Sequence, residues 1–130
     1  MTATARVLGL VVEERKRQDA KWGEQNHPNV DRLVLDHGEA PTQHSMARFY
    51  EVPNAMRAKL LCQMAADRGE CTWAHILVEE VAEAIEAATI HDLGLLVDSL
   101  QELRAELVQV AAVAVQWIEK IDEETTKYEH

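Results

Sequence analysis

Two segments in the second half of the chain combine an apolar stripe at helical spacing with a line of oxygen-bearing side chains beside it. The stripes consist of Leu77, Val81, Ala84, Ile85 and Ala88 in the first segment and of Leu103, Leu107, Val110, Ala114, Trp117 and Ile121 in the second. Glu80 and Glu83 lie beside the first stripe, and Glu106 and Gln109 lie beside the second. Residues three apart are neighbours on a helix surface. Two such helices packed face to face would therefore bring four oxygen ligands around one hard cation.

The remaining segments also favour helices, and the sequence predicts an all-α fold with a four-helix-bundle type of domain. We expect a single domain over residues 1–130, because a chain of 130 residues ordinarily forms one core. The expected order is a helix over 3–20, a long loop over 21–53, a helix over 54–67, a helix over 72–88, a connector over 89–98, a helix over 99–122 and a frayed tail over 123–130. Asn54, Thr72 and Ser99 are the expected N-caps, and Gly69 is the expected stop of the second helix.

The last of these helices carries apolar residues on its outer face as well as on its stripe. Val108, Ala111, Ala112 and Val115 lie on that outer face. A helix that is apolar nearly all round is buried on every side. In so short a chain this pattern predicts a subunit interface, and therefore a homodimer or homotetramer.

The chain is strongly acidic, with a formal net charge of -10 at pH 7. Such a surface repels nucleic-acid backbones and anionic membranes, so we expect neither as a partner. No apolar run approaches the roughly 20 residues that span a bilayer, and the amino-terminal segment lacks the features of a signal peptide. These absences predict a cytoplasmic protein. Cys62 and Cys71 form no CxxC motif, so we expect reduced thiols without a structural role.

The carboxylates beside the apolar stripes are expected to be partly buried, which is costly unless their charge is compensated. Neighbouring carboxylates also raise each other's pKa and repel, and a cation such as Mg²⁺ relieves both costs. The alternative is ordinary: Glu is a good helix former, and a lone ExxE pair on a helix carries no information. Two pairs on facing helices make the metal site a specific hypothesis. Gln109 weakens it, because a neutral amide oxygen binds Mg²⁺ less tightly than a carboxylate does.

These residues resemble the signature of the MazG-like, all-alpha nucleoside triphosphate pyrophosphohydrolases, which is EExxE, a spacer and then ExxD. Here the signature reads Glu79-Glu80-x-x-Glu83 and then Glu106-x-x-Gln109. The resemblance covers residues 72–122, less than half of the chain. It implies Mg²⁺, or Mn²⁺ as a substitute, held by Glu80, Glu83 and Glu106, with Gln109 in the place of the fourth ligand. It also implies dimers or tetramers that cleave nucleoside or deoxynucleoside triphosphates to the monophosphate and pyrophosphate, with Glu79 or Glu80 as the catalytic base.

Gln109 departs from the family pattern and leaves three interpretations open. In the first the metal binds more weakly, in the second Glu102 completes the site, and in the third the protein binds nucleotides without cleaving them. The last interpretation makes the chain a non-catalytic nucleotide-binding or regulatory helical bundle. A di-iron bundle is disfavoured, because such bundles use Glu-x-x-His pairs and neither Glu80 nor Glu106 has a histidine three residues on.

The segment from Lys21 to Pro28 is similar to a short segment bearing Trp and His in some deoxynucleotide-specific members of that family. The candidate substrate-binding residues are Lys21, Trp22, Gln25, Asn26 and His27. The ring of Trp22 can stack on a base. The amide side chains of Gln25 and Asn26 can hydrogen-bond to a base edge, and Lys21 and His27 can bind phosphate. In the alternative interpretation Trp22 covers the core and the residues before Pro28 form a turn. The chain has no P-loop or Rossmann glycine motif.

Overall fold

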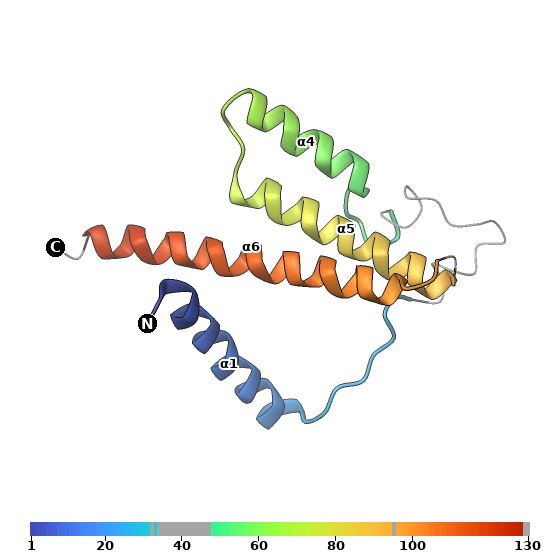
Figure 1. Ribbon diagram of the computed structural model, residues 1–130, viewed down its shortest axis with the longest axis horizontal. Helices are drawn as coiled ribbons and strands as arrows, with labels where there is room; N and C mark the ends of the chain where they lie inside the picture. The colour runs from blue at the N-terminus through green and yellow to red at the C-terminus, as the bar shows by residue number, and fades with distance from the viewer. Residues whose placement is uncertain (32, 34–47, 95, 129–130) are drawn as a thin grey trace. The chain divides into compact units, whose positions relative to one another are not determined.

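The computed structural model describes residues 1–31, 33, 48–94 and 96–128. All regular secondary structure in that part of the chain is helical, which confirms the predicted all-α class (Figure 1). The helices with described bounds are α1 (Ala3–Trp22), α4 (Ala55–Asp67), α5 (Trp73–Leu93) and α6 (Ser99–Tyr128). The chain divides into two compact units, one formed by Met1–His27 with Ala112–His130 and the other by Pro28–Ala111. A four-helix bundle stays a prediction, and so does a single domain.

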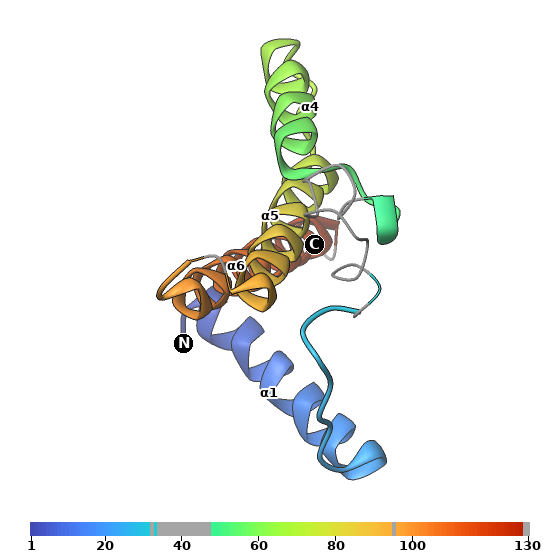
Figure 2. The same cartoon turned by 90° about the vertical axis from the view of Figure 1, so that its right-hand side faces the viewer.

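The Pro28–Ala111 unit contains a hairpin of α4 and α5, which pack side by side (Figures 1 and 2). The Asn54 side chain accepts a hydrogen bond from a backbone N–H in the first turn of α4, as predicted for its N-cap. Gly69 adopts a φ of +70°, and its N–H donates to the Ala66 carbonyl over 2.9 Å. The N–H of Glu70 donates to the Ala65 carbonyl over 2.7 Å. These two bonds form the Schellman motif, so the predicted stop at Gly69 is confirmed.

The start of α5 is fixed by reciprocal hydrogen bonds between Thr72 and His75. The Thr72 hydroxyl accepts from the backbone N–H of His75 over 3.1 Å. His75 Nδ1 accepts from the backbone N–H of Thr72 over 3.2 Å. A histidine thus takes the place that Glu or Gln holds in the usual capping box, and the predicted N-cap at Thr72 is confirmed.

The end of α5 lies further along the chain than the sequence predicts. The helix continues to Leu93, so the expected connector over 89–98 is wrong for its first five residues. Thr89 is completely buried, and its hydroxyl donates to the Ile85 carbonyl over 2.9 Å. This bond satisfies the hydroxyl within the helix. Thr89 can therefore be buried in the last part of α5, although threonine is typical of connectors. The helix ends at Gly94, which has a φ of +70°.

A small apolar core joins α5 to the first turns of α6 within the same unit. Its buried members are Val30, Ala88 and Leu103, and Tyr50 and Ala87 pack against them. Ala88 and Leu103 belong to the two predicted stripes, which therefore meet in this core. Val30 and Tyr50 come from the segment predicted to be a long loop, so these parts of the segment are packed.

Polar contacts also connect residues of the same elements. The Ser99 hydroxyl lies 2.8 Å from Nδ1 of His91. Ser99 is the first residue of α6 and not the residue before it, so the predicted N-cap at Ser99 is wrong. The Asn29 side chain donates to the Asp92 carboxylate over 3.0 Å. The serine is thus used for contact between α5 and α6 instead of capping.

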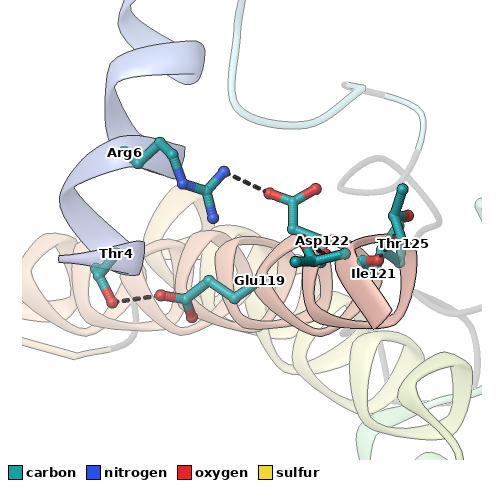
Figure 3. A network of polar contacts seen from close by, with 7 residues as sticks. Thr4, Arg6, Glu119, Ile121, Asp122 and Thr125 are labelled. Atoms are coloured by element: carbon teal, nitrogen blue, oxygen red, sulfur yellow. Dashed lines mark hydrogen bonds and ion pairs between the residues drawn. The ribbon is translucent and has the colours of Figure 1, made fainter. Parts of the chain in front are cut away.

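In the other unit, polar contacts join the start of α1 to the carboxyl-terminal part of α6 (Figure 3). Arg6 Nη1 lies 2.6 Å from Oδ2 of Asp122 in an ion pair. The Thr4 hydroxyl is hydrogen-bonded to the Glu119 carboxylate. Val7 is completely buried.

α1 and α6 are both longer than predicted. α1 ends at Trp22, so Lys21 and Trp22 belong to its last turn and not to the predicted loop. α6 continues to Tyr128, six residues past the expected end at Asp122. The structure therefore differs from the expected frayed tail over residues 123–128, and residues 129 and 130 lie outside the described part of the chain.

The predicted apolar stripe of α6 is only partly buried. Leu103 is buried, whereas Leu107 and Ile121 are each 52% exposed. Val113 and Val115, which lie off the predicted stripe, are buried. None of the helices over the described ranges is both long enough and apolar enough to cross a bilayer.

Candidate metal centre

Three glutamates from two helices of the Pro28–Ala111 unit converge at one point. Glu80 and Glu83 lie one turn apart on α5, and Glu106 lies on α6. Each offers one carboxylate oxygen, and these three oxygens all lie within 4.8 Å of one another. All three side chains are half-buried. The two acidic lines that the sequence places beside the apolar stripes therefore face each other at these three residues.

The three carboxylates are poorly compensated by the protein. Oε2 of Glu80 and Oε2 of Glu106 are buried and find no hydrogen-bond partner among the residues that the structure describes. A buried polar atom without a partner is costly, and the cost is larger for a charged group. Such oxygens are better explained as ligands of a cation than as members of a complete hydrogen-bond network.

The electrostatics of the cluster favour protonation when no cation is bound. Burial raises the pKa of Glu80, and the charges of Glu83 and Glu79 raise it further. Burial also raises the pKa of Glu83, to which the charge of Glu106 and a hydrogen bond with Glu106 add. Lys59 of α4 opposes this shift for Glu83. The cluster is therefore a set of like charges that a divalent cation would stabilise.

The donor set and its spacing suit a hard divalent cation. All three ligand atoms are carboxylate oxygens, which Mg²⁺ and Mn²⁺ prefer over softer donors. Opposite ligands of an octahedral Mg²⁺ are about 4.2 Å apart, since each bond is about 2.1 Å long. Oxygens within 4.8 Å of one another can thus reach one ion after small side-chain adjustments. The residues present fit the ion that the sequence implies.

A cavity of about 440 Å³ opens beside the cluster. Glu83 and Glu106 belong to both the cluster and the cavity wall. The wall also carries the carboxylates of Glu86 and Glu102 and the apolar side chain of Ile90. The volume of the cavity falls within the range of small-molecule sites. An acidic cavity next to a carboxylate cluster can accept a polyanion only together with cations.

Gln109 and Glu79, two further predicted site residues, lie in different surroundings. Gln109 is exposed to solvent. Glu102, one turn before Glu106, lines the cavity. Glu79 is half-buried, and its charge helps to raise the pKa of the Cys62 thiol on α4. The structure therefore brings Glu102, and not Gln109, to the cavity that adjoins the three carboxylates.

The predicted substrate-binding residues belong to the other compact unit. Lys21 Nζ lies 5.0 Å from the centroid of the Trp22 ring, in a cation–π contact. Trp22 is 56% exposed, so it does not cover a core as the alternative interpretation supposed. His27 Nε2 lies 2.8 Å from Oε1 of Gln25. A role for these residues and for Asn26 in substrate binding stays a prediction.

One pair of reactive side chains was not expected from the sequence. Cys62 and Cys71 are nine residues apart, and their sulfur atoms lie 3.5 Å apart. The predicted stop at Gly69 and the predicted cap at Thr72 together imply a tight reversal of the chain. That reversal is the signal that could have placed Cys71 back against α4.

Comparison of the chain with protein-family models, with curated proteins and with solved structures finds no match. The geometry of the three glutamates and the motif that contains them are therefore the support for a function.

Proposed function

We propose that this chain is a Mg²⁺-dependent nucleoside triphosphate pyrophosphohydrolase that prefers deoxynucleoside triphosphates and acts in the cytoplasm. The observation that carries the proposal is the convergence of Glu80, Glu83 and Glu106 beside a cavity of about 440 Å³, with two buried oxygens that lack a partner among the described residues. The resemblance of residues 79–83 and 106–109 to the pyrophosphohydrolase signature supplies the reaction class. Neither observation alone would distinguish this function from a general cation site.

Glu80, Glu83 and Glu106 would hold the ion. When bound, Mg²⁺ neutralises charge on a phosphate chain and makes a water molecule a better nucleophile. The cavity walls that carry Glu86 and Glu102 repel a bare triphosphate, so the substrate enters together with its cations. This requirement gives the acidic chain a way to bind a polyanion.

Proton transfer falls to Glu79 or Glu80. Water attacks phosphorus, the bond between the α- and β-phosphates breaks, and the products are the nucleoside monophosphate and pyrophosphate. Glu79 adjoins the cluster in sequence, and its charge contributes to the raised pKa of Glu80. A carboxylate in that position can accept the proton that the attacking water loses.

The test is release of pyrophosphate by the purified chain from the common nucleoside and deoxynucleoside triphosphates, with Mg²⁺ and with Mn²⁺. Glu83→Gln and Glu106→Gln should each lower turnover by about a hundredfold or more, because each removes a charged ligand. Glu13→Gln on α1 is the matched control, since Glu13 is exposed and forms a surface ion pair with the exposed Lys16. Failure to release pyrophosphate from every triphosphate with either ion would count against the proposal.

A second candidate is a non-catalytic nucleotide-binding or regulatory bundle. The exposed, neutral Gln109 at the position of the family's Asp favours it. Gln109→Asp distinguishes the two functions. A large gain in turnover from a nearly silent wild type indicates a weakened family site, whereas unchanged high turnover in both forms indicates that Gln109 is not needed as a ligand. Mg²⁺-dependent triphosphate binding without pyrophosphate release in either form indicates the regulatory bundle.

A further inference from the structure

Cys62 and Cys71 form a pair of thiols at the closed end of the α4–α5 hairpin. Cys62 lies within α4, and Cys71 lies in the turn directly before the N-cap of α5. Their Sγ atoms are 3.5 Å apart. A disulfide requires about 2.05 Å, so an approach of about 1.5 Å would join them. The Schellman turn at Gly69 holds the chain reversal that brings the two residues together.

The two thiols differ in accessibility. Cys71 is exposed, whereas Cys62 is half-buried. Burial, followed by contacts with Cys71 and Glu79, raises the pKa of Cys62 to about 12. A thiol of this kind is a poor nucleophile towards reagents in solvent, because the thiolate is the reactive form. Cys71 is therefore the thiol that reacts first with an external oxidant. Cys62 is then placed to attack the modified Cys71 and form the disulfide.

We propose that Cys62 and Cys71 are a redox modification site that forms a reversible intramolecular disulfide with a small-molecule disulfide as the oxidant. The Cys71 thiolate attacks one sulfur of the small disulfide, its S–S bond breaks, and one small thiolate leaves. The Cys62 sulfur then attacks the Cys71 sulfur, the mixed disulfide breaks, and the second small thiolate leaves. The two protons of the cysteine thiols end on the two released thiolates, so one small disulfide is reduced to two thiols.

The disulfide would change the surroundings of Glu79. In the reduced protein the charge of Glu79 helps to raise the pKa of the Cys62 thiol, and oxidation removes the thiol proton from beside this carboxylate. Glu79 adjoins Glu80 of the carboxylate cluster. An effect on turnover rests on the proposed function, whereas formation of the disulfide does not, so the two are tested by different measurements.

The test uses the full chain at low micromolar concentration in mixtures of oxidised and reduced glutathione. After alkylation, mass spectrometry should show monomers that have lost two hydrogens, with both cysteines protected and with recovery on reduction. The oxidised form should melt at a Tm roughly 5 °C or more above the reduced form, because a short closed loop restricts the unfolded chain. Neither readout requires activity.

Two single variants serve as controls. Cys62→Ser should accumulate the glutathione mixed disulfide at Cys71 and lose the rise in Tm. Cys71→Ser should react at least about tenfold more slowly, because the remaining thiol is half-buried. If the wild type instead keeps Cys62 open to alkylation while Cys71 carries glutathione or links two chains, the proposal is overturned.

Discussion

At the scale of single residues, the buried oxygens of Glu80 and Glu106 are the groups whose cost is least compensated within the described ranges. A buried carboxylate can lower this cost by taking up a proton or by binding a cation. The first route stabilises the apo protein at low pH, and the second stabilises the loaded protein at higher pH. These two routes make opposite predictions for the effect of pH, so they can be separated by adding a chelator.

The first prediction concerns the stability of the apo protein. The pKa of Glu83 is raised in the folded state. The stabilisation by its proton is fully present below the pKa of the unfolded chain and is lost as pH rises through the folded pKa. In the presence of a chelator, Glu83→Gln should therefore match the wild type near pH 4 and exceed its free energy of unfolding by about 1 kcal/mol at pH 8. Urea unfolding at both pH values measures this difference.

Glu13→Gln is again the control, because Glu13 is exposed. It should change the free energy of unfolding by less than about 0.5 kcal/mol at either pH. Equal stability of Glu83→Gln and the wild type at pH 8 would show that the folded protein does not raise the pKa of this carboxyl.

At the scale of helices, the boundaries that are set locally could be predicted and those that are set by packing could not. Asn54, Gly69 and Thr72 act through hydrogen bonds to residues a few positions away, so the sequence alone indicates them. Thr89 looks like a connector residue in the sequence, but it is buried in the structure and α5 continues through it to Leu93. Ser99 looks like an N-cap, but its hydroxyl is hydrogen-bonded to His91, from another helix.

A pair of glycine substitutions tests the assignment of these boundaries. Gly69 has a φ of +70°, and a Cβ there would meet no atom within 4 Å. Gly69→Ala should therefore destabilise the fold by about 1 kcal/mol through backbone strain alone. Gly9 lies inside α1, and its added Cβ would also meet no atom within 4 Å. Gly9→Ala should stabilise by about 0.5–1 kcal/mol.

Chemical unfolding of both variants measures the two effects. The same added methyl group is predicted to act with opposite sign at the two positions, so each variant is the control for the other. A stabilising Gly69→Ala would contradict the Schellman turn at the end of α4.

At the scale of the whole molecule, the candidate site could be predicted in part. Glu80, Glu83 and Glu106 were expected together because helical spacing places each acidic line beside an apolar stripe. Gln109 was expected with them through the same helical spacing and through the family motif, but it is exposed. Spacing on one helix cannot say which residue of a line meets the facing helix, because that depends on how far the helices slide along each other. The same limit explains why Leu107 and Ile121 lie on the predicted stripe and yet are exposed in the single chain.

The exposed apolar residues of α6 motivate a prediction about assembly. Leu100, Leu107 and Val108 are 54%, 52% and 53% exposed. All three line one cavity of about 520 Å³ in the Pro28–Ala111 unit. Exposed apolar patches often mark interfaces, and we propose that they are covered in a homodimer or homotetramer. Leu107→Glu should then shift the chain to a monomer in light scattering coupled to size-exclusion chromatography.

Gln116→Glu is the control for assembly, since it adds the same charge at an exposed position of the same helix. It should leave the oligomeric mass unchanged. A wild-type chain that is monomeric at high micromolar concentration would contradict the proposed assembly.

Calorimetric titration of the apo protein with Mn²⁺ near neutral pH addresses the carboxylate cluster itself, with no dependence on the choice of nucleotide. We predict saturable binding to the wild type, with an affinity that falls as pH is lowered, because protons compete with the ion for Glu80 and Glu83, whose pKa values are raised. Glu83→Gln and Glu106→Gln should each weaken the affinity by about tenfold or more, since the number of charged ligands sets cation affinity. The control, Glu13→Gln, should bind the ion as the wild type does. Absence of saturable binding, or identical binding by the wild type and both cluster variants, would contradict the assignment of these three glutamates as a metal site.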